Sequence, residues 1–238
     1  MKKVAMIRVG IDSGCGGIQG PIFRDGTFEY IPIPDNFDID ERTYENTRGR
    51  SGEKLISYFP EPLRSRMASR SIHFDPEFRT YTYGDPTSPK ALLRTLSRGD
   101  MMVLYCGLEG WEVESEPALY IMGYFEIEVA GLASQFSRTD LDQYFRENFH
   151  FRHPDVFKRQ KHDLVLVKGT QKSRLLQHAV KMSTMGKDRN GKPLKVLSPK
   201  MQKIFGDFDG KICFQRSPTR WVHQRYIESA IEFVQSQK

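Results

Sequence analysis

The chain has 238 residues, and at this length a protein buries roughly 70–75% of its unfolded surface without help from disulfides or metals. Hydrophobic residues at 38% and aromatic residues at 12% exclude intrinsic disorder, and three scattered cysteines exclude a disulfide framework and a four-cysteine zinc site. No apolar run reaches the ~20 residues that span a bilayer. We therefore expect one cytoplasmic domain over residues 1–238, with no membrane contact.

Charge is distributed unevenly along the chain, although its formal net value is only +6. Residues 1–150 form an acidic part, with 17 Lys and Arg against 23 Asp and Glu, whereas residues 151–238 form a basic part, with 19 against 7. The basic part predicts a surface that meets a polyanion such as nucleic acid. A solvated face that balances the acidic part is an equally weighted alternative.

The first predicted elements lie in the acidic part. The apolar run 4–9 predicts a buried strand that opens into a glycine-rich loop over 10–17. Asp25-Gly26 predicts a two-residue hairpin turn in which both residues have positive φ. Residues 32–54 are expected to form a loop, and a short helix is expected within 60–70.

The middle of the chain has clearer signals. A helix is expected over 88–98. Ser88 suits its N-cap, Pro89 suits its first helical position, and Gly99 stands just past its end. Strands are expected over 101–105 and 118–129, followed by a helix near 139–147.

In the basic part we expect a strand over 163–167 and helices over 174–180, 198–206 and 226–234. Strands and helices intermix without strict alternation. The predicted class is α+β, with a mixed, partly barrel-like sheet flanked by helices.

The glycine-rich loop is the first candidate for chemistry. Gly14, Gly16 and Gly17 can expose backbone N–H groups that bind an anion, and Asp12 at the strand end can hold a hydroxyl or a metal-bound water. The loop lacks the GxGxxG and Walker spacings. A tight crossing that only glycine fits explains it almost equally well.

His73 and Asp75 form the second candidate. Two residues apart in an extended segment, they share one face and can act as a general base with its orienting carboxylate, or as two metal ligands. No third ligand stands at a diagnostic spacing, so we rank metal binding below catalysis, catalysis below a structural role, and assign no metal. Asp75 and the later Asp85 also suit turns.

Two further segments suit a nucleotide. Aromatic and basic residues alternate from Asn148 through His150 to 154, a pattern typical of base stacking with phosphate contacts, although a surface loop with buried phenylalanines is slightly favoured. Lys168, Ser173 and Arg174 flank a predicted helix start, where free N–H groups attract anions. An ordinary capped helix with solvated lysines is the competing interpretation.

Several of these segments together resemble the third nucleotide-modification-associated domain family. The matching stretches are 8–17, 20–23, 28–34, 73–78, 82–85, 99–108, Asn148 with His150, and 173–176, which spread over nearly the whole chain. The resemblance implies a role in making or handling modified DNA bases. Separately, 99–105 and 120–127 are similar to the strand pair of the PUA-like fold and its EVE and ASCH relatives, which accept nucleic acid or an extruded base.

We therefore expect an enzyme, in a phage-related setting, that modifies a nucleotide or DNA base in a polar pocket. Asp12, His73 and Asp75 are the expected acid, base or orienting groups. The expected binding residues are Gly14, Gly16, Gly17, Lys168, Ser173 and Arg174 for phosphate, Tyr83 or Tyr105 for stacking, and Asp85, Asn148 and His150. We expect Asp12, His73 and Arg174 to face one shared cavity.

Two other functions fit the same residues. One is a non-catalytic PUA- or EVE-like reader of modified or flipped bases. The other is a subunit of a phage-defence or restriction assembly, with partner proteins. No adenosylmethionine, flavin or nicotinamide motif stands out, so no cofactor is assigned.

Overall fold

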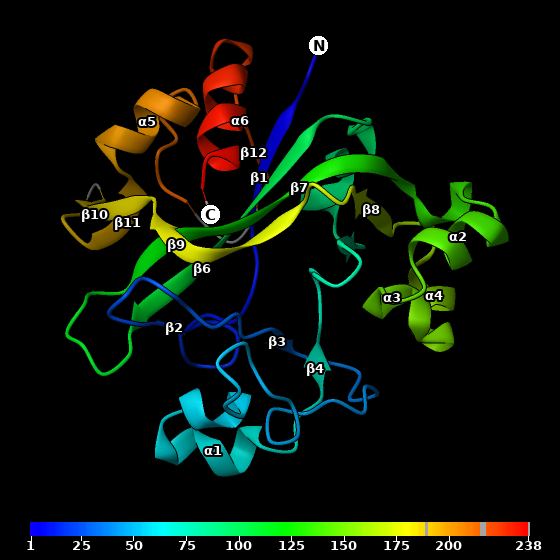
Figure 1. Ribbon diagram of the computed structural model, residues 1–238, viewed down its shortest axis with the longest axis horizontal. Coiled ribbons are helices and arrows are strands. Elements are labelled where there is room, and N and C mark those ends of the chain that lie inside the picture. The colour runs from blue at the N-terminus through cyan, green and yellow to red at the C-terminus, as the bar shows by residue number, and fades with distance from the viewer. Residues whose placement is uncertain (189, 215–217, 238) are drawn as a thin grey trace.

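The computed structural model describes residues 1–188, 190–214 and 218–237, and a mixed β-sheet lies at its centre (Figure 1). The strands of this sheet are β1 (Val4–Arg8), β2 (Gly20–Ile22), β5 (Thr82–Asp85), β6 (Met101–Gly110), β7 (Ala118–Leu132), β8 (Val165–Gly169), β9 (Arg174–Lys181) and β12 (Arg220–Trp221). Their order is β12-β1-β6-β7-β8-β5, with β2 also paired to β6 and β9 to β7. The path is open and does not close into a barrel in the described residues, and the α+β class with a mixed sheet flanked by helices is confirmed.

Strand β7, with 15 residues, joins three neighbours. Its first part pairs antiparallel with β6 and with β9, and its last part, from Ile127 to Leu132, pairs with β8. A Cβ at Gly123 would lie 2.5 Å from the carbonyl oxygen of Arg174. Only glycine allows β9 to approach β7 this closely.

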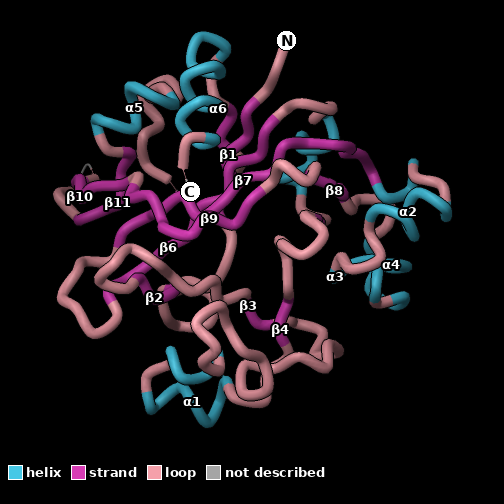
Figure 2. The backbone as a smooth tube through the Cα atoms, viewed as in Figure 1, coloured by secondary structure: helices cyan, strands magenta, loops and turns pink. Residues whose placement is uncertain are grey.

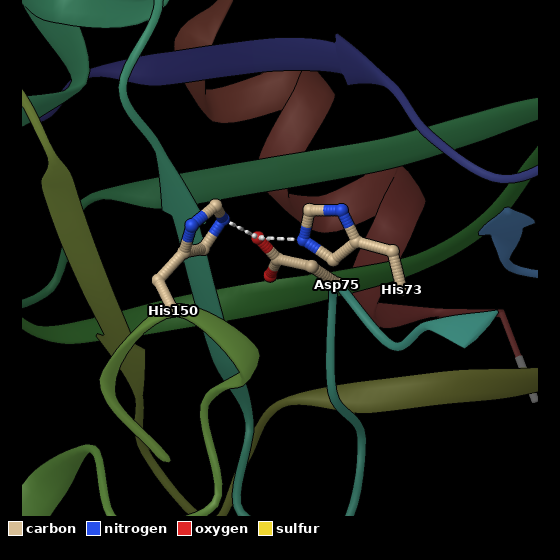
Figure 3. Close-up of side chains that lie close together, drawn as sticks. All are labelled: His73, Asp75 and His150. Carbon is tan, nitrogen blue, oxygen red and sulfur yellow. Dashed lines mark ion pairs between the residues drawn. The ribbon is translucent and has the colours of Figure 1, made fainter. Parts of the chain in front are cut away.

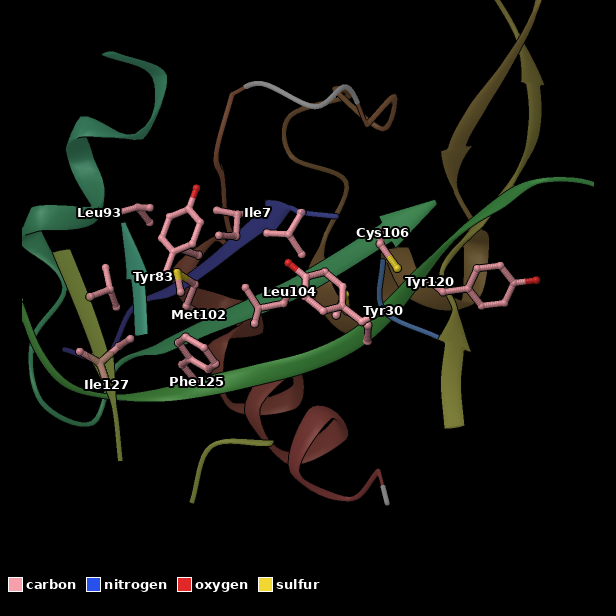
Figure 4. Close-up of a cluster of buried hydrophobic side chains, with 14 of the residues drawn as sticks. Ile7, Tyr30, Tyr83, Leu93, Met102, Leu104, Cys106, Tyr120, Phe125 and Ile127 are labelled. Atoms are coloured by element: carbon pink, nitrogen blue, oxygen red, sulfur yellow. The ribbon is translucent and has the colours of Figure 1, made fainter. Parts of the chain in front are cut away.

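Alternate side chains of β6 enter cores on opposite faces of the sheet, as the two-residue period of a strand requires. Met102 and Leu104 belong to the core that also holds Phe125 (Figure 4), whereas Val103 and Tyr105 belong to the core on the other side. The second core packs under α5 (Pro199–Phe205) and α6 (Ile227–Gln235).

The remaining elements are short. They are α1 (Glu61–Met67), α2 (Arg138–Tyr144), α3 (Phe149–Arg152), α4 (Pro154–Gln160), β3 (Ile33–Pro34), β4 (Ile72–His73), β10 (Ser183–Lys187), β11 (Pro193–Leu197) and 3₁₀ helices at Leu55–Tyr58, Ser88–Thr95, Ala133–Gln135 and Gln224–Tyr226. No helix among the described residues has the length and apolarity needed to cross a bilayer.

Two small cores beside the sheet carry the segments that form the site. One lies within the loop-rich stretch from Ile11 to Ile72, where β3 pairs with β4 (Figure 2). The other packs α2 to α4 against β8 through Phe145, Phe151 and Leu166. Strand β5, paired with β8, lies where the two regions meet.

Most of the predicted elements are confirmed, within a few residues at their ends. The strands near the N-terminus and in 101–129, the short helix α1, and the closing helices α5 and α6 are all present, and the helix over 88–98 is present as a 3₁₀ helix. At Asp25-Gly26 the chain does turn, but only Gly26 has positive φ, because the Asp25 side chain accepts a hydrogen bond from Thr27 N–H instead.

The helix predicted over 174–180 is wrong. These residues form β9, because pairing with β7 satisfies their backbone hydrogen bonds across the sheet. The residues between Gly169, which ends β8, and Arg174, which begins β9, therefore connect two strands, and the anion site expected at a helix start has no helix to form it.

Candidate functional site

His73, Asp75 and His150 converge from two distant segments (Figure 3). The Nε2 atom of His150 lies 3.2 Å from Asp75 Oδ2, and the Nε2 atom of His73 lies 3.9 Å from the same oxygen. One potential ligand atom from each residue lies within 4.8 Å of the others. Both imidazoles therefore face a single carboxylate oxygen.

Strand pairing positions His73 and Asp75. His73 ends β4 and pairs with Ile33 of β3, and Asp75 follows two residues later. The Gly84 N–H of β5 donates to both oxygens of Asp75, at 3.0 and 2.9 Å. The carboxylate is thus held against the sheet.

His150 is positioned by the start of α3. Asn148 caps this helix and accepts a hydrogen bond from His150 N–H at 3.1 Å, while its own amide donates to Thr82 Oγ1 at 3.3 Å and so links α3 to β5. Gln160 Oε1, at the end of α4, lies 2.7 Å from His150 Nδ1. With this partner, Nδ1 carries the proton, and Nε2 faces Asp75.

Glycine at position 84 is a steric requirement of this arrangement. A Cβ there would lie 2.7 Å from Cδ2 of His150 and 3.2 Å from Asn148 Oδ1. The imidazole therefore packs directly on the backbone of β5.

The ionisation of the cluster follows from its burial. Burial raises the pKa of Asp75 to about 6, although His150 and the Gly84 N–H oppose this change. Burial lowers the pKa of His73 far below its usual range, and electrostatic interaction with the neighbouring His150 and His153 lowers it further. For His150, burial lowers the pKa, but Asp75 and Gln160 outweigh it and the net change is upward. His73 is accordingly a neutral imidazole at pH 7.

A cavity of about 320 Å³ opens beside the cluster. His73 and Asp75 lie at its wall, and the other lining residues are Arg8, Val9, Ile33, Tyr83, Gly84, Asp85, Thr87, Pro89 and Lys90. The Tyr83 hydroxyl donates to Asp85 Oδ2 at 2.9 Å. Imidazole, carboxylate, phenol and cationic groups thus share one polar hollow.

The structure brings together five of the residues singled out from the sequence. His73, Asp75, Tyr83 and Asp85 line the cavity, and His150 completes the cluster behind them. Asp12 is not among the described residues that line this cavity, but its carboxylate lies 3.5 Å from the guanidinium of Arg8, which does line it. Asn148 accepts a hydrogen bond from the backbone N–H of His150.

Other residues predicted for this site lie elsewhere. Gly17 lines a different cavity of about 410 Å³, and Gly14 N–H donates to Asp12 Oδ1 within the glycine loop, which also includes Gly16. Tyr105 is fully buried against Phe214 in the second core, which is incompatible with a stacking wall at this cavity.

The basic residues after β8 also lie apart from the cavity. Lys168 Nζ donates to the carbonyl oxygens of Thr80 and Gly169, and buried Ser173 accepts a hydrogen bond from Glu126 N–H at 3.1 Å. Arg174 pairs with Tyr124 in the sheet and is not among the described residues that line the cavity of His73. The prediction that Arg174 shares a cavity with His73 is wrong.

Sequence reasoning missed Arg8, Lys90 and Gln160. Arg8 had a usable signal, because a single cation within the apolar run 4–9 needs a partner when the strand is buried. Lys90 and Gln160 had none, since both stand in helical segments where exposed polar residues are common. His150 is the third member of the cluster with His73 and Asp75, and it stands at no fixed sequence spacing from them.

A second, larger cavity of about 520 Å³ lies on the other side of the segment 73–78. His73 and Asp75 line the first cavity, whereas Phe74 and Phe78 line the second. Its other lining residues are Glu29, Tyr30, Arg42, Thr47, Arg48, Gly49, Arg50, Leu55, Glu77, Arg79 and Leu175. Four arginines beside aromatic rings are suited to phosphate contacts and base stacking.

Comparison with known proteins identifies one family. The sequence model described as "Nucleotide modification associated domain 3" matches residues 3–237. No curated protein matches the chain. No solved structure matches it.

Proposed function

The chain belongs to the nucleotide modification associated domain 3 family, and on this premise we propose that it modifies a nucleotide or nucleic-acid base. The base is held in the cavity beside His73 and Asp75. The observation that carries the proposal is the convergence of His73, Asp75 and His150, of which His73 and Asp75 line that cavity.

The cluster has groups suited to proton transfer. His73 is neutral at pH 7 because burial lowers its pKa, so it can accept a proton from a bound base or from water. Asp75, with a pKa raised to about 6, titrates near the pH at which such transfer is efficient. His73 is the proposed general base, and Asp75 and His150 orient the reacting groups.

The cavity wall has groups suited to a nucleotide. Arg8 and Lys90 supply positive charge for a phosphate. Asp85 is a carboxylate that can accept a hydrogen bond from the exocyclic amine of a base. Tyr83 offers a ring edge and a hydroxyl at the same wall.

Mass spectrometry of nucleosides tests the proposal. Cells that produce the wild-type chain are compared with cells that produce His73→Ala, and His162→Ala serves as the matched control because His162 is exposed and outside the cluster. We expect a modified nucleoside with the wild type and the control, and its loss with His73→Ala. Equal amounts of that nucleoside in all three would refute the assignment of His73.

A second candidate function is a reader of modified or flipped bases, possessing no catalytic step and working with partner defence or modification proteins. The arginine-lined cavity favours it, because phosphate contacts and stacking are sufficient for binding. Titration of a single-stranded oligonucleotide at several salt concentrations distinguishes the two. For a reader, the logarithm of the binding constant falls with the logarithm of the salt concentration, with a slope near −0.7 for each neutralised phosphate. Arg48→Ala should make this slope less steep by about 0.7, the value for one lost phosphate contact. A reader also leaves the nucleoside profile unchanged.

A further inference from the structure

Three groups with available lone pairs meet at one point in this protein. The Nε2 atoms of His73 and His150 are both inaccessible to solvent; His150 Nε2 has an ion-pair contact with Asp75, whereas His73 Nε2 makes no hydrogen bond with any residue in the described part of the chain. Both nevertheless lie close to Asp75 Oδ2, at 3.9 and 3.2 Å. Buried imidazole nitrogens usually have a partner, so this arrangement indicates one that the chain itself does not provide.

We infer that His73 Nε2, His150 Nε2 and Asp75 Oδ2 together bind one divalent first-row transition-metal ion. With the ion bound, the lone pair of His73 Nε2 is used for coordination, so the ion replaces the free imidazole as the activating group of the proposed function. Bonds of about 2.0–2.2 Å from a metal to nitrogen or oxygen place neighbouring ligand atoms roughly 3 to 3.5 Å apart. The distance from His150 to Asp75 already meets this requirement, and the distance from His73 to Asp75 must shorten by about half an ångström. All three ligand atoms lie within 4.8 Å of one another, so the two imidazoles must also move toward each other to share the ion.

The groups behind the ligands are those of a metal site. Gln160 accepts the Nδ1 proton of His150, which leaves the Nε2 lone pair available, and the Gly84 N–H holds the Asp75 carboxylate. Metal-binding histidines characteristically donate their second N–H to an oxygen in this way. These contacts preorganise two of the three ligands before an ion arrives.

The ligand types and their surroundings indicate the class of ion. Imidazole nitrogen suits zinc, iron, nickel and copper, whereas magnesium and calcium prefer oxygen ligands alone. His73 and Asp75 line the 320 Å³ cavity, so the remaining coordination positions face the space proposed for the nucleotide. Three protein ligands with an open position are typical of catalytic sites, where the ion polarises a substrate oxygen or a water molecule.

Metal titration tests the inference without any substrate, so its outcome does not depend on the proposed function. The full chain is purified without a histidine tag, treated with a chelator and titrated with Zn²⁺ in a calorimeter; Co²⁺ is added separately to record visible absorption. We expect one ion per chain, a raised midpoint of thermal unfolding, and no comparable binding of Mg²⁺. His150→Ala should abolish this binding, and His162→Ala, at an exposed histidine, should leave it intact.

A further variant distinguishes the loss of metal binding from the loss of folding. Gln160→Ala keeps all three ligands and removes only the support of His150, so Zn²⁺ affinity should fall about 10- to 100-fold. Circular dichroism checks that each variant is folded. Wild-type protein that binds less than one Zn²⁺ per chain, or His73→Ala and His150→Ala variants that bind as tightly as wild type, would overturn the inference. Metal binding without any altered nucleoside would uphold it and count against the proposed function.

Discussion

Replacement of Gly84 by alanine tests whether the backbone of β5 sets the position of His150. The added Cβ would lie 2.7 Å from Cδ2 of His150, about 0.7 Å closer than the 3.4 Å at which ordinary contact begins. The neighbours Asn148 Oδ1 and Leu166 Cδ2, both at 3.2 Å, leave little room for the methyl group on other sides. The imidazole must therefore move away from β5.

A shift of this size has two measurable consequences. Overpacking of a buried site costs about 1–3 kcal/mol, so the free energy of unfolding of Gly84→Ala should fall by that amount in urea titrations. Metal–ligand distances tolerate changes of only about 0.2 Å, so Zn²⁺ affinity should fall as well. Both effects come from the same steric clash.

Gly14→Ala is the matched control. Gly14 has no positive φ, and its added Cβ would meet its nearest neighbour at 3.4 Å, an ordinary contact. Its stability should stay within about 0.5 kcal/mol of wild type. If Gly84→Ala unfolds at the wild-type urea concentration and keeps wild-type Zn²⁺ affinity, then β5 does not position His150 as argued.

Two other predictions concern stability. Burial alone would raise the pKa of Asp40, but hydrogen bonds from Arg42 and the nearby His153 hold it well below its usual range. This stabilisation is fully present above the ordinary carboxyl pKa of roughly 3.9 and is lost as pH falls through the lower folded value, so the unfolding free energy of wild type should drop below about pH 4. Asp40→Asn should show a shallower drop in urea titrations over the same pH range, and parallel curves would contradict this linkage. Phe125 is fully buried between Phe78 and Tyr81, so Phe125→Ala should cost about 3–5 kcal/mol, whereas Ser137→Ala, which removes an exposed helix cap, should cost about 1 kcal/mol. Equal losses in these two variants, measured by urea unfolding, would refute the burial argument.

Local patterns predicted most of the secondary structure. Ser198 with Pro199, and the apolar spacing over 226–234, specify helices through short-range capping and one buried face, and both helices are present. The helix predicted over 174–180 was wrong because the apolar residues of this run fit the spacing of a helix as well as that of a strand. Pairing with β7 makes this run a strand, because Gly123 of β7 leaves space for β9 to approach.

The candidate site was predictable only in part. The two-residue spacing of His73 and Asp75 placed them on one face, and both do line the same cavity. Tyr105 was misplaced because alternation along β6 directs its ring into the core opposite that of Leu104. Which face of a strand borders a cavity depends on the layers packed against it, and these are absent from the local pattern.

The sequence by itself determined the α+β class, the family, and the residue types available for chemistry at His73, Asp75 and His150. Only the tertiary structure decided that His150 completes the cluster, and that Arg8 and Lys90 rather than Arg174 border its cavity. The physical reason is the range of the interactions. Capping and periodicity act within a few residues, whereas the meeting of β4, β5 and α3 depends on strand pairing and on packing that leaves no room for a side chain at Gly84.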